Sequence, residues 1–380
     1  MESRTSVKQV ISPSVSIAIP VYNEAHYIEK LVYSFLATLY PNLVEVMIAD
    51  GGSTDGTQDI IQHLSTEDSR VRLLHNPQKV QSAGLNLILL HCTGDIFLRA
   101  DAHSDYASDY IERCVELLLE SQALNIGGAT RFAAKTPFQA GVALASKSFL
   151  GGGSAKHRNP DYDGYADTLF LGCFWRKTLQ TVSGYSTDAT TNEDAELNLR
   201  LQKLFVDMNQ IPSQDTGVQQ NLMGKTYGAV YVSSKIKVWY YPRNTWKSLL
   251  IQYFKYGRGR YLTDVKHPKY SPIRGKLPFV VISGTIIMGI ISFFVQFLQP
   301  FFKALILVGL LSIILEGLRV TSKFSKNFSK EIWRGVEHQL PSTLSCWFFC
   351  VVSLTTMLIA HFAGYAYQNF RHNILKISGW

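Results

Sequence analysis

VSIAIPVYNE, residues 15–24, joins an apolar run of strand length to a polar cluster. The same order of residue types returns in VEVMIADGGSTDGT, residues 44–57, and in DIFLRADAH, residues 95–103. Short runs rich in Val, Ile and Leu are typical of buried strands, and the Gly, Asn and Asp residues behind them favour turns. The three stretches therefore predict buried strands that each end in polar side chains.

Helix patterns alternate with strand patterns along the first 100 residues. The predicted strands are residues 15–20, 44–49, 71–74 and 95–100, and the predicted helices are 25–38, 57–65 and 81–91. Regular alternation of strand and helix indicates an α/β fold with a doubly wound parallel sheet. Such sheets bind ligands beyond the carboxyl ends of their strands, so we expect the chemistry directly after these strands.

Polar clusters follow three of the predicted strands, at residues 20–24, 50–57 and 101–103. Taken singly, each has a structural explanation, because Asn and Glu cap helices and a turn of Gly, Asp and Ser leads into a helix. The carboxyl ends of parallel strands lie at one edge of a sheet, so the clusters would meet in one crevice. Together they indicate a ligand site.

Charge divides the 380 residues into three parts. Residues 1–241 hold 20 basic and 25 acidic residues, residues 242–277 hold 9 basic residues and one acidic residue, and residues 278–380 hold 8 basic and 3 acidic residues. A mildly acidic globular domain followed by a basic connector is not a nucleic-acid-binding pattern, and it points to a membrane surface. Five cysteines without framework spacing are expected to be reduced.

Three apolar stretches follow the connector, and we expect transmembrane helices at residues 278–298, 301–318 and 344–367. The first has 21 residues without a formal charge, close to the roughly 20 that cross a bilayer as a helix. The second is weaker, because only 12 residues between Lys303 and Glu316 are uncharged. A re-entrant or interfacial helix is the alternative for this second stretch.

Basic residues flank the first two predicted spans, in the connector at 242–277 and in the loop at 319–334. The positive-inside rule makes both segments cytoplasmic, which predicts a multi-pass protein of the inner (cytoplasmic) membrane with its large domain in the cytoplasm. Three crossings would place the C-terminal tail on the opposite face. Residues 1–14 are polar, so we expect no signal peptide.

The stretches VSIAIPVYNE, ADGGSTDGT, RADAH and NED occur in this order along the chain. In order and spacing they resemble the family 2 glycosyltransferases of the GT-A fold. RADAHSDY, together with QYFKYGRGR at residues 252–260, is similar to the succinoglycan-type glucosyltransferases. A dehydrogenase is a poorer match, because no Gly-x-Gly-x-x-Gly follows the first strand.

The resemblance implies that a nucleotide sugar, expected to be a UDP-hexose, binds at the strand ends. The implied nucleotide contacts are Pro20, Tyr22, Asn23, Glu24, Asp50, Asp55 and Asp101. Of these, Asp50 would accept a hydrogen bond from the base, because a carboxylate recognises an N–H donor. The family has a second acid where this chain has Gly51.

Asp101, Ala102 and His103 stand where the family has Asp-x-Asp. The resemblance implies a Mg²⁺ or Mn²⁺ ion on Asp101, which would stabilise the negative charge of the departing nucleoside diphosphate. One carboxylate with substrate oxygens and waters suffices for Mg²⁺, whereas His103 as a second ligand would favour Mn²⁺. Asp105 is a reserve ligand. A strand-end Asp beside a surface His is the structural alternative.

Glu193 and Asp194 begin a predicted helix, where acidic residues are also common because of the helix dipole. The resemblance selects Asp194 as the general base that takes the proton of the acceptor hydroxyl, with Glu193 beside it. A single base without a carboxylate nucleophile implies direct displacement with inversion at the anomeric carbon. The resemblance places Trp175 and Arg176 on the acceptor side, although core packing explains Trp175 nearly as well.

Gln252, Arg258 and Arg260 lie in the connector, where related membrane synthases carry a Gln-rich, Arg-Trp motif. On an interfacial helix their polar groups would meet the donor diphosphate or lipid phosphates. A plain basic stretch at the membrane surface is the alternative.

The expected activity is inverting, metal-dependent transfer of a hexose, by resemblance from UDP-glucose. The expected acceptor is a polyprenyl-diphosphate-linked saccharide in exopolysaccharide assembly. A polyprenyl-phosphate sugar synthase is the nearest alternative, and a catalytically inactive nucleotide-sugar-binding scaffold is a second one. Intact Asp101 and Asp194 argue against the inactive scaffold.

Overall fold

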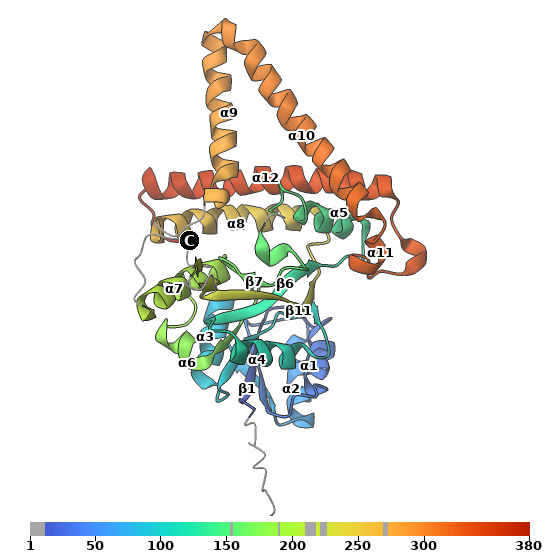
Figure 1. Cartoon of the computed structure of the whole chain (residues 1–380), viewed down its shortest axis with the longest axis vertical. Coiled ribbons are helices and arrows are strands. Elements are labelled where there is room, and N and C mark those ends of the chain that lie inside the picture. Colours follow the sequence, from blue (N-terminus) through green and yellow to red (C-terminus); the bar gives the residue numbers. More distant parts are fainter. Residues whose placement is uncertain (1–11, 153–154, 189–190, 210–217, 221–225, 269–272) are drawn as a thin grey trace, which may run out of the picture.

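We analysed a computed structural model, which describes residues 12–152, 155–188, 191–209, 218–220, 226–268 and 273–380. Residues 1–11, on which most of the signal-peptide prediction rests, lie outside the described part. Figure 1 shows a sheet domain at one end of the molecule, a layer of helices in the middle and a helical hairpin at the other end.

The predicted parallel strands are confirmed. They are β1 (Val15–Val21), β2 (Leu43–Asp50), β3 (Val71–His75) and β4 (Ile96–Arg99), which lie side by side in the order β3-β2-β1-β4. Val21 lies opposite Asp50, and Ala18 lies opposite Arg99, so the three strands end at nearly the same level. This register brings the polar clusters after β1, β2 and β4 to one edge of the sheet.

Helices cover both faces of this half-sheet. They are α1 (Ile28–Leu36), α2 (Thr57–Glu67) and α4 (Tyr110–Glu120) on one face and α3 (Gln81–His91) with α7 (Glu193–Met208) on the other. Helix α1 buries Ile28, Leu31, Val32 and Phe35, which share one face at helical spacing. Each fully buried side chain of this kind contributes roughly 1.5–3 kcal/mol, so burial of these faces fixes the layers on the sheet.

The sheet continues past β4 with strands of mixed direction, in the order β8-β6-β11-β5. These are β8 (Cys173–Trp175), β6 (Asn125–Phe132), β11 (Val230–Tyr240) and β5 (Ser104–Tyr106), with β7 (Gly164–Tyr165) paired to β11. Helix α6 (Arg176–Thr181) follows β8, and β9 (Val218–Gln220) and β10 (Thr226–Gly228) form a separate small hairpin. The predicted doubly wound α/β architecture is confirmed.

In the described part of the chain, six α-helices lie outside the layers that cover this sheet. They are α5 (Pro137–Ser146), α8 (Trp246–Lys266), α9 (Leu277–Phe294), α10 (Gln299–Ser325), α11 (Phe328–Glu331) and α12 (Thr343–Asn373). Helices α9 and α10 rise together as a hairpin, and α8, α12 and α5 lie across its base, between the hairpin and the sheet (Figure 1). A third core cluster of α5, α8, α10 and α12 side chains holds this layer together.

Three helices are long and apolar enough to cross a membrane, namely α9, the segment Gln296–Ser325 that contains α10, and α12. In the first two only 6% of the apolar window is buried inside the protein, whereas in α12 the share is 39%. Helix α10 is continuous over 27 residues, or about 40 Å, so the second stretch is long enough to cross although its charges confined the predicted span to 301–318.

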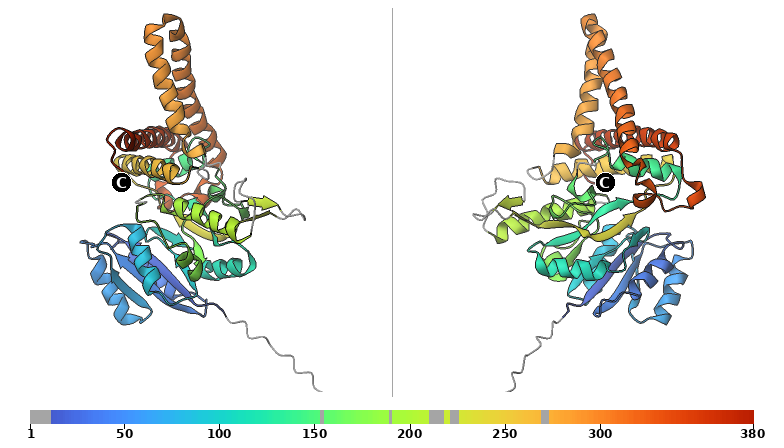
Figure 2. Two further views of the ribbon diagram at one scale, coloured as in Figure 1. Left: turned by 90° about the vertical axis from the view of Figure 1, so that its left-hand side faces the viewer. Right: turned by 45° about the vertical axis from the view of Figure 1, so that its right-hand side comes forward.

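Helix α12 is placed differently from the other two. Figure 2 shows α12 and α8 end-on beside each other while the α9–α10 hairpin stands upright. The residues after α12 return to α8: Gln368 Nε2 donates to Gly379 O over 2.7 Å, and the Arg258 guanidinium lies 4.3 Å from the Trp380 ring centroid. The tail therefore packs on the sheet domain's side of the hairpin, and its predicted place on the opposite face of a membrane stays a prediction.

Candidate functional site

The loops after β1 and β2 are hydrogen-bonded into one unit. The backbone N–H of Asn23 donates to Ser53 Oγ over 2.7 Å, and the backbone N–H of Thr54 donates to Asn23 Oδ1 over 2.9 Å. Asn23 has a φ of 57°, a left-handed conformation that Asn tolerates better than most residues. The Ala25 amide adds a third bond, to Asp55 Oδ2. The predicted nucleotide residues of the first two clusters are therefore brought together.

Asp50 organises the second loop from inside. Its buried carboxylate accepts hydrogen bonds from the Gly52 amide at 2.8 Å, the Ser53 amide at 3.0 Å and Gln58 Nε2 at 2.7 Å. All three bonds fall on Oδ2, so Asp50 supports the loop, and its expected recognition of the base stays a prediction. Tyr22 is exposed at the rim of the loops, where an aromatic ring is free to stack on a base.

Arg99, at the end of β4, was missed by the sequence analysis and lies at the centre of the site. Its side chain is 2% exposed, and its guanidinium faces three carboxylates. Nη2 lies 3.1 Å from Glu193 Oε1 and 3.5 Å from Asp101 Oδ1, while Nη1 donates to Asp194 Oδ1. An Arg inside an otherwise apolar strand was the available signal, because a buried charge requires partners of opposite sign.

Burial and Arg99 act in opposite directions on the proposed base. Burial raises the pKa of the Asp194 carboxyl well above its usual range, Arg99 counteracts this rise, and the charge of Glu193 adds to it. A carboxylate with a raised pKa binds a proton more strongly, which suits a group that must accept one near neutral pH.

Asp101 and His103 lie on the loop after β4 but face different groups. Gln81 Nε2 donates to Asp101 Oδ1 over 3.2 Å. Nδ1 of His103 lies 3.4 Å from Glu24 Oε1, and the His103 ring packs against Tyr240. The loops after β1 and β4 therefore meet through Glu24 and His103, as the sheet register requires.

Comparisons with known proteins agree with this geometry. The family described as "Glycosyl transferase family 2" matches residues 16–166. Over 278 residues the chain is 36% identical to "Succinoglycan biosynthesis protein ExoA" of Rhizobium meliloti (strain 1021), an alignment that covers 73% of this chain and 78% of that protein. The chain belongs to glycosyl transferase family 2. The predicted resemblance to succinoglycan-type enzymes is confirmed.

Two further relatives of this glycosyltransferase are more distant. It is 24% identical to "Dolichyl N-acetyl-alpha-D-glucosaminyl phosphate 3-beta-D-2,3-diacetamido-2,3-dideoxy-beta-D-glucuronosyltransferase" of Methanococcus voltae, over 73% of this chain and 83% of that protein. Among solved structures it aligns with the "Mannosyltransferase PcManGT from Pyrobaculum calidifontis in complex with GDP-Man and Mn2+", with a TM-score of 0.48 and 17% identity, over 95% of this chain and 88% of that one.

The metal prediction for the glycosyltransferase passes a limited test of fit. Among the described residues, the hydrogen bonds and ion pairs of the Asp101 carboxylate all fall on Oδ1, which leaves Oδ2 for a cation. No group of three His, Cys, Asp or Glu side chains in the described part is arranged as a metal site. The residues therefore suit an ion held by one carboxylate and by substrate oxygens.

The reserve ligand Asp105 is engaged elsewhere in the glycosyltransferase. Its Oδ2 accepts a 2.6 Å hydrogen bond from the Tyr241 hydroxyl, and its Oδ1 lies 3.3 Å from Lys30 Nζ. Because β5 pairs with β11 at the far edge of the sheet, Asp105 ties these strands to α1.

The acceptor residues Trp175 and Arg176 do not reach the site of the glycosyltransferase. Strand β8 runs antiparallel to β4, so Trp175 lies opposite Ile96, at the start of β4, and Arg176 Nε donates to Gly94 O. Five residues of extended chain separate Ile96 from Asp101, a span of about 16 Å. The structure therefore does not bring these two residues to the carboxylates around Arg99, and their acceptor role stays a prediction. Trp175 packs against the sheet core.

The connector residues of the glycosyltransferase divide between two faces of α8. Gln252 Nε2 donates to the hydroxyls of Tyr240 at 3.2 Å and Tyr256 at 3.0 Å, and Tyr240 contacts the His103 ring. Arg258 Nε instead donates to Gln368 Oε1 of α12 over 3.0 Å. Gln252 thus lies beside the strand-end loops, whereas Arg258 faces α12, so its expected contact with the diphosphate stays a prediction.

Arg260 lies near the short turn at Ile273–Gly275, since a Cβ on Gly275 would approach its side chain. Its position is on the membrane-side layer. A contact with lipid phosphate remains a prediction for this residue.

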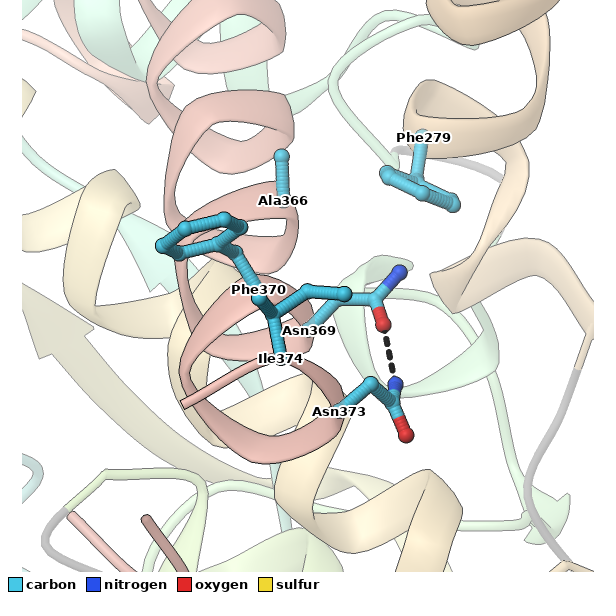
Figure 3. A pocket seen from close by; sticks show the side chains of 6 residues that line it. All are labelled: Phe279, Ala366, Asn369, Phe370, Asn373 and Ile374. Carbon is cyan, nitrogen blue, oxygen red and sulfur yellow. Dashed lines mark hydrogen bonds between the residues drawn. The ribbon is translucent and has the colours of Figure 1, made fainter. Parts of the chain in front are cut away.

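A cavity of about 270 Å³ lies on the membrane side of the glycosyltransferase, between α9 and α12 (Figure 3). It is lined by Phe279, Ala366, Asn369, Phe370, Asn373 and Ile374, and Asn373 donates to Asn369 across its wall. None of the predicted site residues lines it.

Replacing Arg99 by Gln should shift the acid limb of the kcat/KM pH profile to higher pH. Arg99 lowers the pKa of Asp194, so its loss raises that pKa, and the base is then deprotonated only at higher pH. Breaking a buried ion cluster also destabilises the fold by about 3–5 kcal/mol, so the melting temperature is measured beside the profile. If folded R99Q had an unchanged acid limb, Arg99 would not be the group that lowers the pKa of the base.

Proposed function

We propose that the chain is an inverting, metal-dependent hexosyltransferase that moves a sugar from a nucleoside diphosphate sugar to a lipid-linked saccharide. The observation that carries this proposal is the meeting of Asp101, Glu193 and Asp194 around Arg99 at the edge where the β1 and β2 loops join. The closeness of these carboxylates supports the proposal, because a direct displacement requires a cation-binding carboxylate and a base near each other.

In the proposed reaction the acceptor hydroxyl attacks the anomeric carbon while Asp194 takes its proton. The bond between the anomeric carbon and the diphosphate oxygen breaks, and the nucleoside diphosphate leaves with the electron pair. Arg99 holds Asp194 in place, and Glu193 shares the same guanidinium. Because attack and departure occur on opposite faces of the carbon, the configuration inverts.

Asp101 would hold the divalent ion, which when bound neutralises charge on the diphosphate of the donor. His103 lies two residues after Asp101 on the same loop, but its Nδ1 faces Glu24. We therefore propose Asp101 as the principal protein ligand and His103 as a secondary one.

We propose a UDP-hexose, expected to be UDP-glucose, as donor and a polyprenyl-diphosphate-linked saccharide as acceptor in exopolysaccharide biosynthesis. The name of the Rhizobium relative supports the pathway, and the name of the Methanococcus relative supports a saccharide on a lipid phosphate as acceptor. The apolar hairpin supports an acceptor in the membrane, because it holds the sheet domain close to lipid.

Membranes containing the chain should transfer radiolabelled hexose from one nucleotide sugar of a donor panel into a lipid extract. The Asp194→Asn variant should lose roughly 100-fold or more of the turnover while its nucleotide affinity stays near that of the parent, because the base acts on the acceptor. Label on polyprenyl phosphate itself would favour the polyprenyl-phosphate sugar synthase, and binding without transfer would favour the scaffold. Turnover of D194N within a few-fold of the parent would move the base elsewhere, with Glu193 next.

Chelation should abolish transfer, and Mg²⁺ or Mn²⁺ should restore it in the parent but not in Asp101→Ala, because that variant lacks the carboxylate that holds the ion. His103→Asp should shift the preference from Mn²⁺ toward Mg²⁺, since an oxygen ligand suits the harder ion. An unchanged metal preference in H103D would exclude His103 from the ligands. Full activity in the presence of chelator would contradict the proposal that transfer depends on a metal ion.

For the membrane topology we propose two crossings, α9 and α10, with the sheet domain in the cytoplasm and α12 along the cytoplasmic surface of the inner membrane. The exposed apolar residues Leu344, Phe348, Ile359 and Phe370 recur at intervals of 4 and 11 residues, so they share one face of α12. The opposite face, with Cys350, Met357 and Gly364, packs on the other helices of the layer. An amphipathic helix of this kind lies in the interface.

A cysteine at Gln296, at the tip of the hairpin, should react with an impermeant thiol reagent added to intact cells. Cysteines at Ser325 and Ser378 should not, because in this topology both positions are cytoplasmic. The five native cysteines are buried and give a low background. Labelling of S378C together with protection of S325C would instead establish three crossings.

A further inference from the structure

Helix α7, which carries Glu193 and Asp194, is attached to α8 through the two residues that precede it, Thr191 and Asn192. Asn192, at the N-cap position, has a φ of 62° and makes no capping bond with its side chain. Its Nδ2 instead donates to Tyr256 O of α8 over 3.1 Å, and Thr191 Oγ1 donates to Lys255 O over 3.0 Å. Two hydrogen bonds thus join the residues three and two positions before the proposed base Asp194 to the backbone of α8.

Gly259 makes this approach possible. A Cβ at this position would lie 2.8 Å from Thr191 O and 2.9 Å from Asn192 Nδ2, closer than real Cβ atoms come to other heavy atoms. Any other residue would therefore push α8 and the start of α7 apart. Because glycine lowers helix stability, its presence inside the 21-residue α8 is explained by this contact.

Gly257 has the same role on the other side of α8. A Cβ there would lie 2.8 Å from Tyr365 N of α12, and a Cβ on Gly364 of α12 would lie 2.8 Å from the Phe254 carbonyl carbon. Residues two apart in a helix point about 200° apart, so Gly257 and Gly259 open opposite faces. The sequence YGRG at residues 256–259 thus lets α8 fit between α7 and α12.

A second attachment lies one turn further along α7. The Glu196 carboxylate is buried, and its Oε1 lies 3.2 Å from Lys266 Nζ and 3.1 Å from His267 Nε2, at the end of α8. These partners and Arg200 lower the pKa of Glu196 to about 2 in spite of its burial, so it stays ionised. Helix α7 is therefore fixed to α8 at two points, and neither involves the sheet.

We propose that Gly259, together with Asn192 and Thr191, is a positioning element that places Asp194 for the proposed reaction through contact with the membrane-side helix α8. The inference rests on the proposed role of Asp194 as the base. It assigns to the glycines of the connector a function that the sequence analysis sought in its arginines. The base is then correctly placed only when the layer of α8 and α12 is packed against the start of α7.

The test compares Gly259→Ala with Gly284→Ala in the full-length chain in membranes. Gly284 lies in α9, where a Cβ would meet nothing within 4 Å, so G284A is the matched control. We expect G259A to lower kcat by about 10- to 100-fold with the KM of the donor within about twofold, because a base displaced by less than 1 Å loses its alignment. The kcat of G284A should equal that of the parent.

Asn192→Gly provides a second variant in case G259A does not fold. Glycine keeps the left-handed backbone at this position and removes only the bond to Tyr256 O, so we expect kcat to fall about 3- to 10-fold. In both variants the acid limb of the kcat pH profile should move, because Asp194 shifts relative to Arg99. A merely structural role would lower the amount of folded enzyme and leave the limb in place.

Parental kcat in both G259A and N192G would overturn the positioning role. So would a loss that matches a fall in the folded fraction, measured from the bound nucleoside diphosphate per chain. The result for D194N separates the two proposals: an inactive D194N with active G259A and N192G contradicts only the positioning role, whereas an active D194N contradicts the assignment of the base.

Discussion

A buried guanidinium surrounded by three carboxylates is the constraint on which the catalytic half of this glycosyltransferase depends. Arg99 lies in the central part of the sheet, where it has almost no contact with water. A charge in that position is tolerated only with close partners, and Asp101, Glu193 and Asp194 supply them. Residues about 95 positions apart in the chain are thereby forced together, so the start of α7 has to lie at the end of β4.

Within this ion cluster, the carboxyl groups of Asp194 and Asp101 have different environments. The guanidinium cannot lose its proton in a protein, so its positive charge is fixed. Asp194 bonds directly to it but is also buried, and burial has the larger effect on its pKa. Asp101 lies at the longer distance of 3.5 Å and keeps one oxygen clear of these contacts. Asp194 is thus the acid whose pKa is raised, and Asp101 is the acid with one oxygen left outside the ion cluster.

The sequence predicted the parts of the fold that depend on local pattern and register. The alternating strands and helices of residues 15–100 appear where expected, and parallel register alone brings the clusters after β1, β2 and β4 together. The pattern of residues did not reveal the direction of β8 or the packing of α8 on α12. An antiparallel β8 carries Trp175 away from the site, and packing on α12 turns Arg258 away from it. Hydropathy likewise measures the length of α12 but not which of its faces the protein covers.

The packing of α8 against both α12 and the start of α7 links the helical layer to the ion cluster. Helix α8 can serve both the membrane side and the site only if two other helices approach its backbone closely, and Gly257 and Gly259 permit that on opposite faces. A sheet domain joined to a membrane segment by a loose linker would leave α7 attached at the ion cluster alone. Here α8, which packs on α12, also contacts Asn192, two residues before the proposed base. An acceptor held in the bilayer would therefore meet a base whose position is defined from the membrane side.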